Sequence, residues 1–208
     1  MIEMIEQRTP AWFQARIGKV TASKVADVIA KTKSGYSSIR DNYMAQLVCE
    51  RLTGEKAEGF SNAAIQHGID TEPLARAAYE ALHDVLVDEV GFVPHPSIEM
   101  AGASPDGLVG EDGLIEIKCP QTNTHIETLL SQSVPGKYNT QMQFQMACTG
   151  RKWCDFVSFD NRLPADLQLF VKRVPRDDVF IKQMEEEIVK FLKELDTKIN
   201  QLMKVKNV

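Results

Sequence analysis

Cysteine is scarce in this sequence, and the cysteines present do not follow the pattern of a metal or disulfide motif. The four of them are Cys49, Cys119, Cys148 and Cys154, and no two form a C-x-x-C pair. The histidines are scattered as well, so we expect no zinc site. The irregular spacing also argues against a disulfide framework, and we expect free thiols in a reducing, cytoplasmic environment.

Long apolar runs are absent too. No stretch of about 18 apolar residues occurs, so the sequence contains no candidate for a membrane-spanning helix. Residues 1–8 are charged and lack the apolar core of a signal peptide, so we expect no export. These absences predict a cytoplasmic protein with no membrane partner.

An excess of basic charge is also missing, because the 208 residues carry a net charge of −5. Proteins that bind nucleic acids usually present a basic face, so the net charge alone argues against that class. A nuclease that uses metal ions is an exception, since it concentrates acid at its centre while basic residues cluster locally along the DNA path. For such a protein, this charge predicts weak non-specific binding and a need for Mg²⁺ in tight engagement.

The hydrophobic content of 43% suits one globular domain over residues 1–208, with room for a helical appendage. Apolar patterns predict strands over residues 85–93, 98–100, 108–109, 114–118, 153–158 and 167–173. They predict helices over residues 39–53, 62–83, 122–132, 138–149 and 177–203. Polar loops are expected over residues 34–38 and 53–61.

The stretch from Ser104 to Pro120, SPDGLVGEDGLIEIKCP, is the most informative part of the chain. Asp106 follows a proline and precedes a glycine, which is a turn-forming context. Residues 114–118 then form a short strand that is rich in aliphatic and β-branched side chains. One hairpin turn is enough to return Asp106 to the side of that strand.

Alternate side chains of a strand lie on the same face. Glu116 and Lys118 therefore point the same way, while Ile115 and Ile117 point into a core. With Asp106 returned beside Glu116, two carboxylates and one ammonium converge at one point. An isolated Glu-x-Lys is usually no more than a solvated strand face, and that alternative remains open on spacing alone.

Such a convergence has a chemical use. Two facing carboxylates are costly unless a cation lies between them, and Mg²⁺ is commonly held by one or two carboxylates while it keeps waters and accepts phosphate oxygens. A neighbouring lysine can orient or deprotonate the attacking water, or offset charge in the transition state. The pattern therefore points to hydrolysis of a phosphate ester.

Pro105-Asp106 followed by Glu116-x-Lys118 resembles the signature of the PD-(D/E)xK nuclease superfamily. The wider strings SPDGL and EIKCP resemble those of one branch, the phage-type alkaline exonucleases, of which lambda exonuclease is the type member. The resemblance implies an α/β fold in which helices flank a central mixed β-sheet. Here a long helix over residues 177–203 would follow that core.

The N-terminal segment contains a possible anion site. Thr9 with Pro10 begins a helix, Gly18 ends it, and Thr21 or Ser23 begins the next. The free N–H groups at the start of a helix favour an anion. The alternative is an ordinary pair of helices without a ligand.

The string W-x-x-x-R-x-G-x-x-T-A-S in that segment resembles the N-terminal motif of the phage exonucleases. In the family the arginine and serine hold phosphate near the scissile bond or the 5′ end. The resemblance implies this role for Arg16 and Ser23, and more weakly for Thr21 and Ser104. Trp12 would otherwise be an ordinary core residue.

Two helices supply further candidates by resemblance. Glu72 matches a helical glutamate that faces the metal ions in the family, although by composition it could be a solvated surface residue. Tyr138-x-x-Gln141-x-Gln143 matches a segment whose glutamine reaches the active site. Gln143 is the closer match and Gln141 the alternative. Gln141 and Gln145 lie four residues apart and share a helix face, while Gln143 lies elsewhere.

The resemblance as a whole implies a metal-dependent exonuclease. Asp106, Glu116 and the backbone carbonyl of Ile117 would hold two Mg²⁺ ions, for which Mn²⁺ would substitute. Lys118 would position or activate water. The family degrades one strand of linear duplex DNA 5′→3′ to mononucleotides and leaves 3′ tails. The resemblance also implies that the protein forms a homotrimeric ring, works with a partner protein that anneals single strands, and is located in the cytosol of a bacterium or a phage-infected host.

Two other classes of protein fit the same residues. One is a different nuclease of the superfamily, such as a structure-specific endonuclease or a RecB-like nuclease domain. The other is a non-catalytic module that binds DNA ends, although the complete Asp, Glu and Lys set argues against it.

Overall fold

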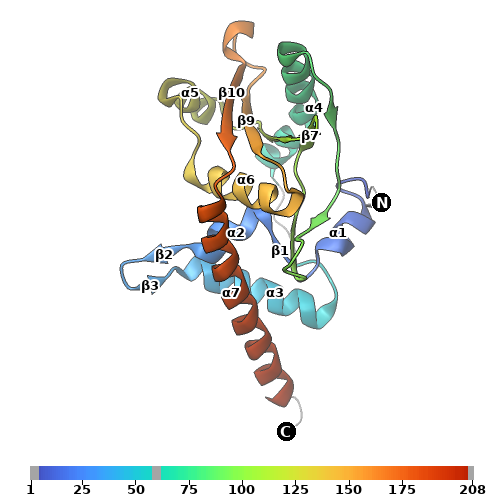
Figure 1. Cartoon of the computed structure of the whole chain (residues 1–208), viewed down its shortest axis with the longest axis vertical. Helices are drawn as coiled ribbons and strands as arrows, with labels where there is room; N and C mark the ends of the chain where they lie inside the picture. The colour runs from blue at the N-terminus through green and yellow to red at the C-terminus, as the bar shows by residue number, and fades with distance from the viewer. Residues whose placement is uncertain (1–4, 58–61, 206–208) are drawn as a thin grey trace.

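The computed structural model describes residues 5–57 and 62–205 (Figure 1). The helices are α1 (Pro10–Arg16), α2 (Ala22–Ile29), α3 (Ser38–Thr53), α4 (Ala63–His83), α5 (Thr122–Ser131), α6 (Gly136–Thr149), η1 (Ala165–Leu167, a 3-10 helix) and α7 (Asp178–Val205). The strands are β1 (Val20–Thr21), β2 (Lys31–Thr32), β3 (Gly35–Tyr36), β4 (Val87–Asp88), β5 (Val93–Pro94), β6 (Ala101–Ala103), β7 (Gly107–Val109), β8 (Gly113–Lys118), β9 (Trp153–Phe159) and β10 (Leu169–Pro175).

The main sheet has five strands in the order β10-β9-β8-β7-β4. Its central strand β8 runs parallel to β9, where Glu116 lies opposite Phe156. On its other side β8 runs antiparallel to β7, where Ile115 lies opposite Gly107. The sheet is therefore mixed, and helices lie on both of its faces (Figure 1), so the predicted α/β class is confirmed.

Helix α4 covers one face of the main sheet and α6 covers the other. Ile115 and Ile117 pack with Tyr79 of α4 in one buried cluster. Leu114, the neighbour of Ile115, packs instead with Met142 of α6. Each buried aliphatic side chain of this kind stabilises the fold by roughly 1.5–3 kcal/mol. The predicted alternation along β8 is confirmed, and it leaves Glu116 and Lys118 on the α6 side.

A second core joins α2, α3, α6 and α7 to a three-stranded sheet of order β1-β6-β5. The buried residues of α7 follow the predicted helical spacing: Ile181, Met184, Ile188, Phe191, Leu192 and Leu195. The far end of α7 extends away from the sheets (Figure 1). There Leu202, which continues the same apolar spacing, is 45% exposed. The helical spacing also predicts an inward position for Leu52 of α3, but that side chain is 46% exposed.

Two predicted strands are wrong in detail. The run 85–93 contains β4 and the start of β5, which belong to different sheets. Residues 98–100 form a turn, in which the Ala101 N–H donates to the Ile98 carbonyl over 3.1 Å, and the strand β6 begins after it. Val90, Phe92 and Val93 are all buried, so the apolar pattern continued across the point where the chain changes sheets.

Helix ends agree well with the sequence signals. Thr9 caps α1 by accepting a hydrogen bond from the Trp12 N–H, and Gly54 and Gly150 end α3 and α6 in the left-handed region. The predicted loop at 34–38 is instead mostly a β2–β3 hairpin and a helix cap. Residues 58–61 of the other predicted loop lie outside the described residues.

The described cysteines are free thiols. Within the part of the chain that the structure describes, no helix combines the length and the apolar character needed to cross a membrane.

Candidate active site

The Pro-Asp-Gly turn returns Asp106 to β8 as the sequence predicts. A Cβ on Gly107 would lie 2.1 Å from Val87 Cγ1 of the neighbouring strand β4, so a larger residue after Asp106 would force that side chain to move. The Asp106 Oδ2 atom accepts a hydrogen bond of 2.7 Å from the Ile117 N–H. Because Ile117 follows Glu116, the turn brings the two acidic residues to the same part of β8.

Glu116 is completely buried, and its carboxylate accepts hydrogen bonds from three side chains. Its Oε1 atom accepts from Gln141 Nε2 over 2.7 Å and from the Lys118 ammonium. Its Oε2 atom accepts from Gln145 Nε2 over 2.5 Å. A buried carboxylate is tolerated only when such donors compensate it, so α6 and β8 together fix the position of this charge.

The charges of the site act strongly on one another. Burial and the negative charge of Glu116 raise the pKa of Asp106 well above its usual range. Burial opposes the charged form of Lys118, but Glu116 and Asp106 outweigh it and raise the pKa of the ammonium. Lys118 is therefore a cation at neutral pH in this arrangement, able to donate hydrogen bonds and to balance negative charge.

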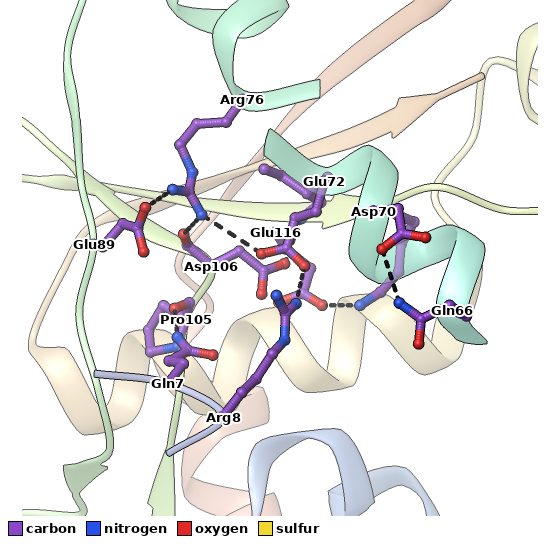
Figure 2. A network of polar contacts seen from close by, with 12 residues as sticks. Gln7, Arg8, Gln66, Asp70, Glu72, Arg76, Glu89, Pro105, Asp106 and Glu116 are labelled. Atoms are coloured by element: carbon purple, nitrogen blue, oxygen red, sulfur yellow. Dashed lines mark hydrogen bonds and ion pairs between the residues drawn. The ribbon is translucent and has the colours of Figure 1, made fainter. Parts of the chain in front are cut away.

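Glu72 projects from α4 toward the same acids (Figure 2). One of its carboxylate oxygens pairs with Arg8, and the other lies 3.5 Å from Arg76 Nη2. Its negative charge contributes to the raised pKa of Asp106. The structure thus brings together Glu72, Asp106, Glu116 and Lys118 from three separate segments.

The donor atoms at this point suit a hard divalent cation. Carboxylate oxygens are the preferred ligands of Mg²⁺ and Mn²⁺. Burial and, after it, the charge of Glu116 raise the pKa of Asp106, and a cation would relieve the repulsion between these carboxylates. Within residues 5–57 and 62–205, no three His, Cys, Asp or Glu side chains are close enough to hold an ion in the present arrangement. The carboxylates of Glu72 and Glu116 are instead held by arginine, lysine and glutamine donors.

A second cluster lies between α1 and the residue that follows β6. The Arg16 guanidinium stacks on the Trp12 ring, 4.0 Å from its centroid, and donates to Ser104 Oγ over 2.9 Å. Trp12 Nε1 donates to the same hydroxyl over 3.0 Å. Burial lowers the pKa of Arg16 to about 10, so the side chain keeps its charge at neutral pH. Trp12 therefore positions a cation and a hydroxyl that the sequence singled out.

A cavity of 170 Å³ opens at this cluster, and two of its lining residues, Arg8 and Gln141, contact the acids. Its lining includes Arg8, Arg16, Ser23, Ser104 and Gln141. Gln141 contacts Glu116, so one side chain belongs to both the cavity and the acidic cluster. The cavity is therefore a cationic recess directly beside the carboxylates.

A neighbouring cavity of 280 Å³ shares Arg16 and Ser23 and adds three lysines, Lys19, Lys24 and Lys56. Thr21 lines this larger cavity, is 8% exposed, and lies 3.5 Å from Ser23 through their hydroxyls. Basic side chains thus gather locally although the net charge of the chain is −5.

Gln143 does not reach the acids, and its predicted place at the site is wrong. Its side chain is 2% exposed and bonds the backbone between β10 and α7 instead, at the Pro175 carbonyl and the Asp177 N–H, each over 2.8 Å. A step of two residues along a helix turns a side chain to the opposite surface. The alternative glutamine, Gln141, contacts Glu116, and Gln145 one turn later does the same.

Three residues that contact Glu72 or Glu116 in the structure were not predicted as site residues from the sequence. Gln145 had a signal, because it lies four residues after Gln141 and shares its helix face. Arg76 could have been found in the same way, because it lies one turn after Glu72 on α4. Arg8 had no such signal, since its partner Glu72 lies far along the chain.

Comparisons with known proteins agree with this geometry. Residues 11–152 match the family described as the YqaJ-like viral recombinase domain. The chain belongs to this family. Together with 53% identity to a solved alkaline exonuclease, this match confirms the resemblance to the phage-type alkaline exonucleases and supports exonuclease activity. No curated protein matches the chain.

Solved structures of related proteins share the fold. An alkaline exonuclease, LHK-Exo from Laribacter hongkongensis, is 53% identical, with 96% of this chain and 98% of that chain covered at a TM-score of 0.89. LHK-Exo in complex with dAMP matches with the same identity and coverage at a TM-score of 0.90. A phage related exonuclease from Haemophilus somnus 129PT is 17% identical, with 88% and 96% covered at a TM-score of 0.73, which shows the fold alone.

Gln141 and Gln143 of α6 allow a matched test of the corrected assignment. We expect Gln141→Ala to lower the nuclease rate by about 10–100-fold, the usual effect of removing a partner that orients a functional carboxylate. Gln143→Ala should lower the free energy of unfolding by about 1–3 kcal/mol, because it removes a buried hydrogen-bonding partner, and leave the rate of the folded enzyme unchanged. DNA digestion assays measure the nuclease rate of both variants, and thermal melts measure their stability. Equal rates for the two variants would contradict it.

Proposed function

We propose that this protein is a Mg²⁺-dependent exonuclease that degrades one strand of linear duplex DNA 5′→3′ to mononucleotides. Its product would be a duplex with 3′ single-stranded tails for recombination by strand annealing. One observation carries the proposal: a cationic cavity at Arg16 and Ser104 is joined through Gln141 to the buried carboxylate of Glu116. A nuclease that starts at a phosphorylated end needs such a recess beside its hydrolytic groups.

Two Mg²⁺ ions would be held by Asp106, Glu116 and the backbone carbonyl of Ile117, with Glu72 beside them. Mn²⁺ would be able to replace Mg²⁺ at these positions. When bound, the ions would supply positive charge to the phosphate that is attacked and to the leaving oxygen. The oxygen-only donor set and the raised pKa of Asp106 support this choice.

The chain's own residues have distinct tasks in this proposal. Lys118 orients the attacking water and balances charge that builds on the phosphate oxygens. Gln141 keeps the Glu116 carboxylate in place. Arg16 and Ser104, with Ser23 and Thr21 near the start of α2, bind the terminal phosphate and set the register of the strand.

Three features favour this substrate. A recess for a terminal phosphate next to the hydrolytic groups favours attack from the 5′ end. The related LHK-Exo has been crystallised with dAMP, a mononucleotide, which supports mononucleotides as product. The lysines of the larger cavity provide contacts for the backbone of duplex DNA.

The family resemblance also supports a homotrimeric ring, a partner protein that anneals single strands, and a place in the cytosol of a bacterium or a phage-infected host. The exposed apolar residues Leu202 and Val205 at the end of α7 are compatible with an interface between subunits.

Digestion of end-labelled duplex DNA tests the proposal. We expect release of mononucleotides from one strand of linear DNA with Mg²⁺, faster from ends that carry a 5′ phosphate than from 5′ hydroxyl ends. Covalently closed circles of the same sequence should stay intact. Cleavage of the circles would identify an endonuclease and remove the polarity, the ring and the annealing partner from the proposal. DNA left unchanged with both Mg²⁺ and Mn²⁺ would identify a module that only binds ends.

A further inference from the structure

Arg8 lies between the cavity and the acids, and it is held in an unusual way. Its φ of 68° places a residue with a side chain in the left-handed region, where such residues are uncommon. The adjacent Gln7 fixes the backbone there: its Nε2 donates to the carbonyls of Val90 over 2.7 Å and of Pro105 over 2.8 Å. The position of Arg8 is thus tied to the residue that precedes Asp106.

The Arg8 side chain itself is held only at its tip. It is 45% exposed, and among the described residues Glu72 is its one hydrogen-bonding partner (Figure 2). Arg76, the other arginine on Glu72, is different because it is only 15% exposed and also bonds Glu89 and the Asp106 carbonyl. Arg76 is therefore fixed by several partners, whereas Arg8 loses its polar contact as soon as Glu72 turns away.

A divalent cation bound to Glu72 would compete with Arg8, because both draw on the negative charge of the same carboxylate. A divalent cation held by Glu72 and Asp106 would displace the guanidinium, which then faces the cavity that it lines together with Arg16 and Ser104. An arginine released there meets a recess suited to phosphate, and guanidinium groups bind phosphate through two parallel hydrogen bonds.

We propose that Arg8 is a phosphate-binding residue that rests on Glu72 until a divalent cation takes that carboxylate, and then contacts the phosphate at the 5′ end of the DNA. This inference rests on the proposed function, since it assumes both the cation and a terminal phosphate. It makes the recognition of the DNA end dependent on the cation through a single side chain.

Binding of the full chain to a duplex with one open end tests this idea. Affinities are measured for 5′-phosphate and 5′-hydroxyl ends, in Ca²⁺ and in EDTA, with a cleavage-resistant phosphorothioate strand. In Ca²⁺ we expect Arg8→Gln to weaken binding of the 5′-phosphate end by about tenfold, the loss of one charge-assisted contact. Binding of the hydroxyl end should be unchanged, and in EDTA the variant should match the wild type for both ends.

A second measurement does not involve DNA. Calorimetric titration with Mg²⁺ alone should show several-fold tighter binding to Arg8→Gln than to the wild type, because no guanidinium has to leave Glu72. Arg8→Lys should recover part of the phosphate preference. Lys152→Gln is the matched control: Lys152 is 71% exposed, pairs with Asp112 over 2.9 Å, and should affect neither measurement.

Several results would overturn the inference. Equal weakening on both kinds of end would reduce Arg8 to a general surface charge. A loss in EDTA equal to that in Ca²⁺ would remove the dependence on the cation. A lower melting temperature with phosphate preference and Mg²⁺ affinity unchanged would make Arg8 purely structural. A wild-type protein without any phosphate preference would instead count against the proposed function itself.

Discussion

Replacing Lys118 by alanine should lower the rate of DNA cleavage by about 10³-fold or more, in the upper part of the range for loss of a positioned proton-transferring or charge-balancing group. The ammonium bonds Glu116 and is held in its charged form by Glu116 and Asp106, so its removal takes a positive charge away from the acids. The phosphate-binding residues Arg16 and Ser104 are untouched. Affinity for DNA ends should therefore stay within a few-fold of the wild type.

Single-turnover cleavage and equilibrium binding of the same linear duplex measure these two effects separately. Lys152→Ala is the control, because Lys152 is an exposed lysine paired with Asp112 and lies outside both cavities. Full activity of Lys118→Ala would exclude the lysine from the reaction. Loss of binding together with loss of cleavage would show that Lys118 holds the DNA or the fold instead.

Replacing Glu116 by glutamine should remove both Mg²⁺ affinity and cleavage. The substitution keeps the size of the side chain but removes a buried negative charge on which Lys118, Gln141 and Gln145 converge. An amide is a poor ligand for a hard cation, and we expect Mg²⁺ binding to weaken by about 10²-fold or more. Cleavage at a fixed Mg²⁺ concentration should fall at least in proportion.

Calorimetric titration with Mg²⁺, repeated with Mn²⁺, gives the affinity independently of the reaction. Glu187→Gln is a matched control, since Glu187 of α7 bonds Lys31 of β2 and Tyr36 of β3 and, in the part of the chain that the structure describes, has no contact with Asp106 or Glu116. Circular dichroism confirms that each variant is folded. Unchanged Mg²⁺ affinity in Glu116→Gln would place the metal elsewhere in the protein.

Local patterns in the sequence were enough to find the hydrolytic half of the site. The turn at Asp106 and the alternation along β8 are both short-range features, and they place Asp106, Glu116 and Lys118 as observed. Helix spacing alone also separated Gln141 and Gln145 from Gln143. The error at Gln143 came from choosing by motif similarity over the helical geometry that the sequence already contained.

Other features depend on contacts between distant segments and could not be read in this way. Val87 and Val93 belong to one apolar run, but the sheet that each joins is decided by a partner elsewhere in the chain, Val109 for the first and Ala103 for the second. The pairing of Arg8 with Glu72 is of the same kind. No spacing rule connects a residue before α1 with one inside α4.

The acidic cluster with Lys118 and the phosphate-binding cluster of Arg16 and Ser104 differ greatly in how much of the chain must fold to form them. The contact between Asp106 and Ile117 spans 11 positions and that between Glu116 and Gln141 spans 25, whereas Arg16 and Ser104 are 88 positions apart. Contacts that close long loops carry the larger entropic cost, and weakly buried terminal segments are the first to open. Detachment of the N-terminal segment would leave the acids and the lysine assembled while Arg8, Trp12 and Arg16 were lost. We therefore expect partial unfolding to produce a nuclease that has lost its preference for DNA ends before it loses its capacity to hydrolyse.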